Sequence, residues 1–373
     1  MKYLFIVQGE GRGHLTQAIA LEEILRSSGH EVVEVLVGKS SSRQLPAFFS
    51  RSIHAPIHRF ESPNFLPTAS NKRNNITRSV AYNVARLPVY LRSMHFIKEH
   101  IARSGADMVV NFYELLTGLA YALYRIPTPQ VCIGHQYLFL HHDFRFPKKS
   151  LPGLWGLKFF TRLTCIGAKK KLALSFHAMD EDVKEDIRVV PPLLRKEVFR
   201  CECSEGDYVH GYMVNSGFAE SVREWHALHP DVPLRFFWDK RGEKTVRRED
   251  DTLSFYPLND VEFLRQMSGC RAYASTAGFE SICEAMYLCK PVLMVPAHIE
   301  QDCNAFDAES NGAGIVSDSF ELDRLLAFAE QYVPDVRFRT WVESAPYMIC
   351  YALDPDAYKH QASDHMYMVE EFT

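Results

Sequence analysis

The hydrophobic pattern of the first forty residues predicts a strand, a helix and a second strand. The run YLFIV at 3–7 is continuously apolar and ends near a glycine, which is typical of a strand buried on both faces. From Thr16 to Ser28 the apolar residues share one helical face, and Gly29 follows as a helix-ending residue. The run EVVEVLVG at 31–38 is the next strand. This order is the beginning of a parallel, doubly wound α/β sheet.

The alternation of strands and helices continues along the chain and begins again near residue 190. The stretch VVPPLLRKEV carries two adjacent prolines and is predicted to be the linker between the two series. Strands are predicted at 107–113, 128–135, 207–214, 234–238, 253–258, 270–275 and 291–297. Helices are predicted between the first two of these strands, from about 215 to His229, from Gly278, and over the tail from about 340.

Two such series predict two α/β domains with a cleft between them. We expect the first domain at 1–190, the second at 191–345 and a helical tail at 346–373. The length of 373 residues favours two domains over one, and a hydrophobic content of 47% is enough for two cores.

Composition and charge restrict the class of protein. No apolar run approaches the roughly 18 residues of a membrane-spanning helix, and MKYLFIV is shorter than a signal-peptide core, so we expect a cytoplasmic protein. The nine cysteines include no CxxC pair, which favours buried thiols over structural zinc. The net charge of −4 divides into +10 over 1–190 and −14 over the remainder. A basic half without a nucleic-acid motif suits an anionic membrane or acceptor, or is a solvated face balanced by the acidic half.

The stretch STAGFESICEAMYLCKPVLMVPAHIEQDCNAFDA at 275–308 is the strongest candidate for a binding site. Small residues from Ser275 to Gly278 lie between a predicted strand and a predicted helix. Small side chains let a ligand approach the backbone, and the N-terminus of a helix attracts phosphate. Glu284 lies two turns into this helix, where its carboxylate can accept two hydrogen bonds from a ribose diol.

The residues after the next predicted strand complete an ordered set. Glu300 and Gln301 lie where the far end of such a ligand would reach, and Asn304 shares a helical face with Glu300. The set resembles the nucleotide-sugar signature of the inverting, two-domain (GT-B) glycosyltransferases, close to the MurG-like family 28 enzymes and to the UDP-dependent family 1 enzymes. The spacing that carries the resemblance is a glutamate seven residues before Pro291, and an acidic-Gln pair after Pro296.

The resemblance implies a fold and a set of roles. The implied fold is two Rossmann-like doubly wound domains facing across a cleft, with a C-terminal helix that crosses back and packs on the first domain. Thr276 stands where the families often have a histidine. The positions implied for the donor are Thr276, Gly278 and Ser281 at the diphosphate, Glu284 at the ribose, and Glu300, Gln301 and Asn304 at the sugar.

The opening stretch QGEGRGHLTQAIAL resembles the glycine-rich first loop of MurG-like enzymes. The resemblance places Gly11 and Gly13 in the cleft beside the donor diphosphate. No ribose-binding acid follows the second strand, which disfavours a nicotinamide cofactor. His14 can take a proton from an acceptor hydroxyl, and Glu10 is the rival base in the same loop. The alternative is that His14 only caps the helix or lines the cleft.

Four further positions match the resemblance less closely. It implies that Arg195 in the linker reaches the diphosphate, although an ordinary linker arginine fits equally well. It places Ser216 near the donor, Leu258 where the base is read through the backbone, and Gln136 on the acceptor side. The cluster His141-His142-Asp143 could hold a metal, but enzymes of this type stabilise their leaving group without one. We therefore expect no metal and no cofactor besides the sugar donor.

The stretch at 144–174 interleaves aromatic and basic residues. From Arg145 to Lys171 it holds eight Lys and Arg and no acid. Such a mixture suits the headgroup region of a membrane, and MurG-like enzymes use a patch of this kind because their acceptor is lipid-linked. The alternative is a core helix whose lysines extend to solvent.

Taken together, the sequence predicts an inverting glycosyltransferase that moves a hexosyl group from a nucleoside diphosphate sugar, expected to be a UDP-sugar, to an acceptor hydroxyl. The resemblance implies a place in cell-envelope glycan or glycolipid synthesis, with peripheral contact at the inner face of the plasma membrane and no nucleic-acid partner. Two alternatives stay open: a nucleotide-sugar 2-epimerase of the same fold, and a non-catalytic subunit that binds the donor.

Overall fold

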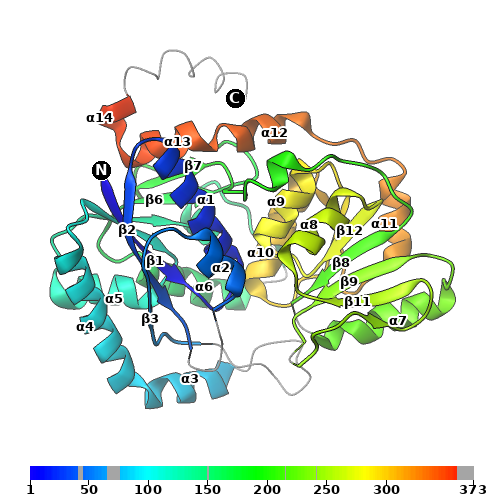
Figure 1. The fold of residues 1–373 in the computed structure, drawn as a ribbon, viewed down its shortest axis with the longest axis horizontal. Helices are drawn as coiled ribbons and strands as arrows, with labels where there is room; N and C mark the ends of the chain where they lie inside the picture. Colours follow the sequence, from blue (N-terminus) through cyan, green and yellow to red (C-terminus); the bar gives the residue numbers. More distant parts are fainter. Residues whose placement is uncertain (41–44, 65–75, 149–150, 215, 241, 359–373) are drawn as a thin grey trace.

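The computed structural model describes residues 1–40, 45–64, 76–148, 151–214, 216–240 and 242–358. Over these residues the chain forms two parallel-stranded layers with helices on their faces, side by side along the long axis of the molecule (Figure 1). We call the elements up to residue 190 the first half, and those from 209 to 329 the second half.

The first half begins with the predicted strand, helix and strand. All of Tyr3 to Val7 are buried, as a strand covered on both faces requires. Its strands are β1 (Lys2–Gln8), β2 (Glu31–Gly38), β3 (Ile57–Phe60), β4 (Met108–Phe112), β5 (Gln130–Ile133), β6 (Ala168–Leu174) and β7 (Ile187–Val190). Its helices are α1 (Gly13–Ser27), α2 (Ala47–Ser52), α3 (Ile76–Ala85), α4 (Leu87–Ser104), α5 (Leu115–Tyr124) and α6 (Leu151–Thr164), with the 3₁₀ segment η1 (His135–Leu140).

The second half repeats the architecture. Its strands are β8 (Val209–Met213), β9 (Leu234–Trp238), β10 (Arg247–Arg248), β11 (Leu253–Pro257), β12 (Ala272–Ser275), β13 (Val292–Met294) and β14 (Gly314–Val316). Its helices are α7 (Ala219–Leu228), α8 (Asp260–Ser268), α9 (Phe279–Tyr287), α10 (Ile299–Ser310) and α11 (Leu322–Ala329), with the 3₁₀ segment η4 (Ser216–Phe218) before α7. A further 3₁₀ segment, η3 (Val198–Arg200), lies between the two halves in the sequence.

The strand order confirms the predicted α/β class. The first sheet runs β3-β2-β1-β4-β5-β6-β7 and the second β10-β11-β9-β8-β12-β13-β14. Every pairing between described strands is parallel except that of β10 with β11. In such sheets ligands bind outside the carboxyl ends of the strands, where the order reverses, which in these sheets is beside β1 and beside β8.

Three short helices return the chain from the second half to the first. α12 (Val336–Glu343) packs on α9, and α13 (Ala345–Leu353) packs on α1 and β7. The indole Nε1 of Trp341 donates to the carbonyl of Ser175 at 3.0 Å, which fixes the crossing. α14 (Pro355–Tyr358) follows (Figure 1). The part of the predicted tail beyond 358 lies outside the described residues, and the domain boundaries at 190/191 and 345/346 stay predictions.

Some sequence-based boundaries were wrong. The basic stretch at 144–174 is not one helix, because α6 ends at Thr164 and AKKKLAL forms the strand β6, whose last four residues are buried. The helix predicted from Thr16 begins at Gly13, and the helix predicted from 215 begins as η4 and becomes α-helical at Ala219. Strands β3, β7, β10 and β14 were not predicted, because polar or charged residues interrupt the short apolar runs of β3 and β7, β10 is only two arginines, and β14 has only three residues.

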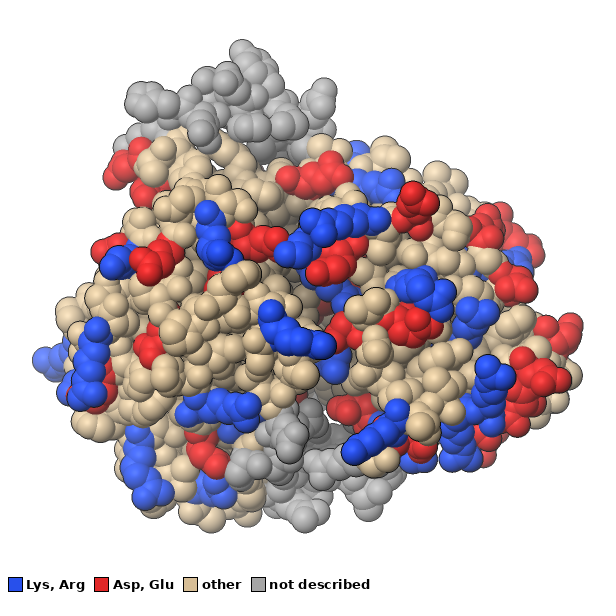
Figure 2. All heavy atoms as spheres, in the orientation of Figure 1, with Lys and Arg blue, Asp and Glu red and all other residues tan. Residues whose placement is uncertain are grey.

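The face of the molecule shown in Figure 2 does not divide into a basic and an acidic part. Figure 2 shows basic and acidic side chains interspersed over both halves, with acidic side chains gathered toward the outer edge of the second half. Among the described residues, no helix combines the length and the apolar character that crossing a membrane requires.

Candidate active site

The loop after β1 faces the second half, and Gly13 lies directly against it. A Cβ added at Gly13 would overlap the carboxylate of Glu280 on α9, so that side chain would have to move away from its present position. A Cβ at Gly11 would meet no described atom within 4 Å. A side chain at Gly13, but not at Gly11, would therefore displace Glu280.

His14 lies in the first turn of α1, buried between the halves, with a polar neighbour at each ring nitrogen. Its Nδ1 is 3.1 Å from Oε1 of Gln17, three residues further along the helix. Its Nε2 is 3.4 Å from Nε2 of Gln136. Because an amide oxygen only accepts, Nδ1 carries the proton and donates it to Gln17. His14 is thus assigned as a neutral imidazole whose Nε2 keeps its lone pair.

Each of these two glutamines also contacts a glutamate of the second half. The amide of Gln17 donates to Glu280, and the amide of Gln136 donates to Glu300 with Nε2 and Oε1 2.9 Å apart. The order Glu280, Gln17, His14, Gln136, Glu300 forms a continuous polar row between the two halves, which we call the His14 row. The row brings three predicted residues, His14, Gln136 and Glu300, together in one place.

Burial sets the protonation of this row. It lowers the pKa of His14 below its ordinary value, while Gln17 and the negative charge of Glu300 act in the opposite direction. A base must be neutral before it accepts a proton, and a lowered pKa keeps His14 neutral at physiological pH. Burial also raises the pKa of Glu280 to about 7.

Two residues predicted for the donor, Arg195 and Glu284, contact each other. The guanidinium of Arg195 donates from Nε to Oε1 of Glu284 at 2.6 Å, and from Nη2 to Oε2 at 2.9 Å. Its Nη1 donates to the carbonyl of Asp260 at 3.2 Å, and the carboxylate of Asp260 pairs with Arg12 of the glycine loop at 2.5 Å. A carboxylate has about four lone-pair sites, so Glu284 can accept two further hydrogen bonds.

The turn between β12 and α9 is held in a strained conformation. Ala277 has φ of +56°, a region that residues with a Cβ seldom adopt. The amide of Asn304 donates to the carbonyl of Ala277 at 3.3 Å and fixes it. The hydroxyl of Thr276 accepts from the backbone of Val214 at 3.1 Å and so joins this turn to the end of β8. Gly278, with φ of −73°, is the N-cap of α9.

The remaining predicted donor residues follow strands of the second half. Ser281 donates to the carbonyl of Gly278 at 3.1 Å. Gln301 accepts from the backbone of Ala297 at 2.9 Å, so its amide oxygen shapes the loop before α10. Ser216 begins η4 after β8, and Leu258 follows β11. All of these positions are at the carboxyl ends of second-half strands, on the side where this sheet would bind a ligand.

An apolar cavity adjoins the His14 row in the first half. Its volume is about 340 Å³. Tyr113, in its lining, stacks on His14 with ring centroids 5.6 Å apart, and its backbone has a φ of +60°, unusual for so large a residue. The apolar wall includes Val84, Leu87, Tyr90, Leu91, Met94 and Leu119. The ring of Tyr113 therefore contacts both the cavity and the imidazole, while His14 itself is not part of the cavity lining.

Two carboxyl groups lie in the wall of this cavity. Glu10, the rival base, lines it and accepts a hydrogen bond from the backbone of Ser40 at 2.5 Å. Glu114 accepts from the hydroxyl of Ser62 at 2.6 Å and from the backbone of Leu116 at 3.1 Å, and burial raises its pKa to about 7. Glu10 thus belongs to the cavity wall, whereas His14 belongs to the row that joins both halves.

The histidine cluster considered for metal has structural partners. His142 pairs with Asp182 at 2.9 Å, and its Nε2 lies 3.1 Å from Asp143. Asp182 also accepts from the backbone of Lys184, and His141 bonds the carbonyl of Asp180 at 2.9 Å. These contacts organise the turn before β7.

Comparison with known families decides the class of the protein. The model of a family described as glycosyl transferase family 1 matches residues 1–333. The chain belongs to this family. Membership makes it a glycosyltransferase, and the enzyme class predicted from 275–308 is thereby confirmed.

Solved structures of glycosyltransferases share the fold of this family 1 chain. CalG4, the calicheamicin glycosyltransferase, superposes with a TM-score of 0.59 at 13% identity, over 95% of this chain and 97% of that one. UGT89C1 of Arabidopsis thaliana, complexed with quercetin, superposes with a TM-score of 0.57 at 15% identity, over 98% of each chain. The spinosyn rhamnosyltransferase SpnG, complexed with spinosyn aglycone, superposes with a TM-score of 0.58 at 14% identity, over 95% of this chain and 100% of that one. A search of curated proteins finds no match.

Sequence reasoning missed several residues of this family 1 site. Gln17 could have been found from helical spacing, since it lies three residues after His14. Glu280 lies four residues before Glu284, on the same face of α9. Tyr113 and the cavity gave no local signal, because the wall is assembled from segments far apart in the sequence.

Proposed function

We propose that this glycosyltransferase moves a hexosyl group, with inversion, from a nucleoside diphosphate sugar, expected to be a UDP-sugar, to a hydroxyl of an acceptor with an apolar body. The observation that carries the proposal is the His14 row. It holds a neutral imidazole in a fixed tautomer beside the predicted donor residue Glu300, and Tyr113, which stacks on this imidazole, lines an apolar cavity.

The donor is proposed to bind along the carboxyl ends of the second-half strands. The ribose diol would donate to the two remaining acceptor sites of Glu284. The diphosphate would lie at the first turn of α9, where free N–H groups point outward, within reach of Arg195. A second structure of UGT89C1 is complexed with UDP-L-rhamnose, which supports a nucleotide-sugar donor.

The proposed reaction is a single displacement. Nε2 of His14 takes the proton of the acceptor hydroxyl as the hydroxyl oxygen attacks the anomeric carbon. The bond from that carbon to the diphosphate oxygen breaks, and the negative charge leaves on the diphosphate, which Arg195 and the α9 N-terminus stabilise. One displacement inverts the anomeric centre. The site lies between the two halves, which favours transfer to the acceptor over hydrolysis by water.

The cavity supports an acceptor that is at least partly apolar. UGT89C1 is complexed with quercetin and SpnG with spinosyn aglycone, which supports a carbon-rich acceptor for this fold. The rim of the cavity carries exposed Val84, Leu87 and Leu91. A lipid-linked acceptor, such as cell-envelope glycolipid synthesis uses, would suit both the cavity and its rim.

Contact with an anionic membrane is part of this proposal. On α6, the rings of Trp155 and Phe159 stack with centroids 5.4 Å apart, although they are 75% and 50% exposed. Lys158 lies between them in the sequence, and Phe160, the next residue, lines the cavity. Exposed aromatic side chains beside basic residues are typical of a surface that enters lipid headgroups.

A transfer assay separates this function from its two alternatives. Purified enzyme is incubated with UDP-hexoses and amphipathic acceptors, and the product linkage is determined by NMR. Transfer with inversion that falls at least about 100-fold in His14→Ala supports the proposal. An epimerised UDP-sugar without acceptor indicates the 2-epimerase. UDP binding without any product from any acceptor indicates a donor-binding subunit. If the rate of transfer is unchanged in His14→Ala but lost in Glu10→Ala, the base is Glu10 in the cavity wall and not His14.

A further inference from the structure

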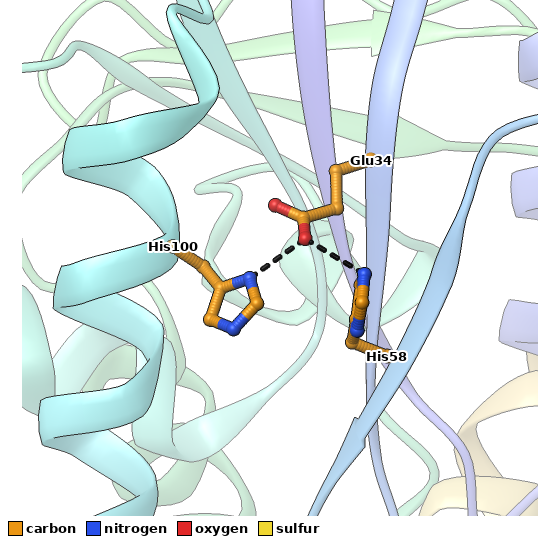
Figure 3. A group of neighbouring side chains, drawn as sticks. All are labelled: Glu34, His58 and His100. Carbon is orange, nitrogen blue, oxygen red and sulfur yellow. Dashed lines mark hydrogen bonds and ion pairs between the residues drawn. The ribbon is translucent and has the colours of Figure 1, made fainter.

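Three potential metal ligands converge on the outer flank of the first half. Glu34 lies on β2, His58 on β3 and His100 on α4, and both imidazoles point at the same carboxylate oxygen (Figure 3). Oε1 of Glu34 is 3.1 Å from Nε2 of His58 and 2.6 Å from Nδ1 of His100. The two rings are 5.0 Å apart between centroids.

The strand pattern explains why these side chains meet. Glu34 points to the same face of the first sheet as Leu36, and His58 to the same face as Phe60, by the alternation of a strand. This face packs against α4, which supplies His100. Phe96, one helical turn before His100, packs on its ring at 4.0 Å. A carboxylate therefore lies in a mostly apolar layer between sheet and helix.

The carboxylate of Glu34 is mostly buried, with 13% of its side chain exposed. Among the described residues, no lysine or arginine forms an ion pair with it. Its partners in the structure are the two imidazoles. The potential ligand atoms of Glu34, His58 and His100 all lie within 4.8 Å of one another, close enough to surround one ion. A divalent cation between the three groups would bind all of them at once.

We propose that Glu34, His58 and His100 bind a divalent transition-metal ion, with Zn²⁺ preferred. Two imidazole nitrogens and one carboxylate oxygen form a donor set that suits Zn²⁺ rather than Mg²⁺ or Ca²⁺, which prefer oxygen alone. Ligand bonds of 2.0–2.1 Å in a tetrahedron place donor atoms roughly 3.4 Å apart. The distance to His58 already approaches this value, and His100 needs to withdraw by about 0.8 Å.

The proposed metal site is separate from the site of the transfer reaction. The C-terminal part of α4 carries His100 and leads into the N-terminal end of β4, so the site lies away from the carboxyl strand ends that form the cleft. In Figure 1, α4 lies on the side of the first half opposite the second half. The ion would join the edge strand β3 to α4, and His58, 46% exposed, would provide its access from solvent.

Calorimetric titration of the metal-free full chain with Zn²⁺, Co²⁺ and Mg²⁺ tests the proposal. We expect one equivalent of Zn²⁺, a visible absorption band with Co²⁺, and no heat with Mg²⁺. His58→Ala, at an exposed position, should weaken Zn²⁺ binding at least about tenfold and abolish the Co²⁺ band, as should His100→Ala. The matched control is His95→Ala, on the same helix but against Tyr124, which should bind like the wild type.

Thermal unfolding with and without Zn²⁺ tests the site even if a variant is less stable than the wild type, because the shift in Tm caused by Zn²⁺ is compared within each protein. Zn²⁺ should raise the Tm of the wild type and of His95→Ala but leave that of His58→Ala unchanged, because only an intact site binds the native state preferentially. Absence of Zn²⁺ binding by the wild type overturns the proposal. Binding of equal affinity in the wild type and in His58→Ala also overturns it, and assigns the ion to other residues, such as those around His142 or the cysteines.

Discussion

Substitution of Gln17 tests whether the His14 row orients a base. Gln17 accepts from Nδ1 of His14 at 3.1 Å and is itself buried. Gln17→Leu keeps a similar size but removes the acceptor, so the imidazole can protonate at either nitrogen. The bond matters most in the transition state, when His14 becomes positively charged. A buried hydrogen bond to a charged group contributes about 1.5–3 kcal/mol, which predicts a loss of about 10- to 150-fold in kcat.

The assay is steady-state transfer with the same UDP-hexose and acceptor, at saturating donor. The KM for the donor should change little, because the side-chain partners of Gln17 in the described part of the chain, His14 and Glu280, are not assigned to the nucleotide. In a His14→Ala background, Gln17→Leu should have no further effect, since the interaction it removes is already absent. Circular dichroism and Tm verify that both variants fold.

The pH dependence gives the sign of the effect. In the wild type, burial lowers the pKa of His14. As pH is lowered, kcat/KM should therefore fall only at pH values below the ordinary pKa of histidine, where the imidazole becomes protonated. Gln17→Glu places a carboxylate beside Nδ1, favours the imidazolium and should move this fall to higher pH. A kcat for Gln17→Leu within about twofold of the wild type, or an unmoved acid limb in Gln17→Glu, refutes the reasoning.

Three further predictions concern the cavity, the glycine loop and α6. Burial raises the pKa of Glu114 to about 7 from an ordinary 4.5, so the free energy of unfolding of the wild type should decline by about 3 kcal/mol as pH rises between these values. Glu114→Gln should abolish this decline, as measured by urea unfolding at pH 5 and pH 8. Equal declines in the wild type and the variant would contradict the prediction. Gly13→Ala should lower kcat/KM more than about tenfold, whereas the control Gly11→Ala should not; equal effects would remove the steric argument. The double change Trp155→Ser and Phe159→Ser should weaken sedimentation with anionic vesicles, and unchanged binding would exclude α6 as the membrane contact.

The sequence predicted those parts of the molecule that depend on local spacing. Buried strands give continuous apolar runs, and helical turns give regular intervals, so both sheets and the residues of 275–308 could be located. The same logic placed Glu284 on α9 and Glu300 and Asn304 on α10. In β3, whose sequence is IHRF, His58 and Arg59 interrupt the apolar run, so no distinct strand pattern remains.

The sequence could not predict which residues of the two halves contact each other. The contact of Gln17 with Glu280, and that of Gln136 with Glu300, depends on how the two halves pack. The pairing of Arg195 with Glu284 could not be predicted either. In the sequence, each residue alone is equally compatible with a direct contact to the phosphate or the ribose of a donor. The strain at Ala277 also comes from tertiary structure, since nothing in STAGF demands a left-handed residue there.

The most direct test of the central claim is calorimetric titration of the wild type, Glu284→Ala and Glu284→Gln with UDP, GDP, TDP and ADP. Glu330→Ala, a change of an exposed acid directly after α11, is the control. The account predicts that the wild type and the control bind UDP equally. It also predicts that both Glu284 variants bind it about 10- to 150-fold more weakly, because the charged acceptor of the ribose diol is lost. Failure of the wild type to bind any of the four nucleotides, or unchanged affinity in the Glu284 variants, would contradict it.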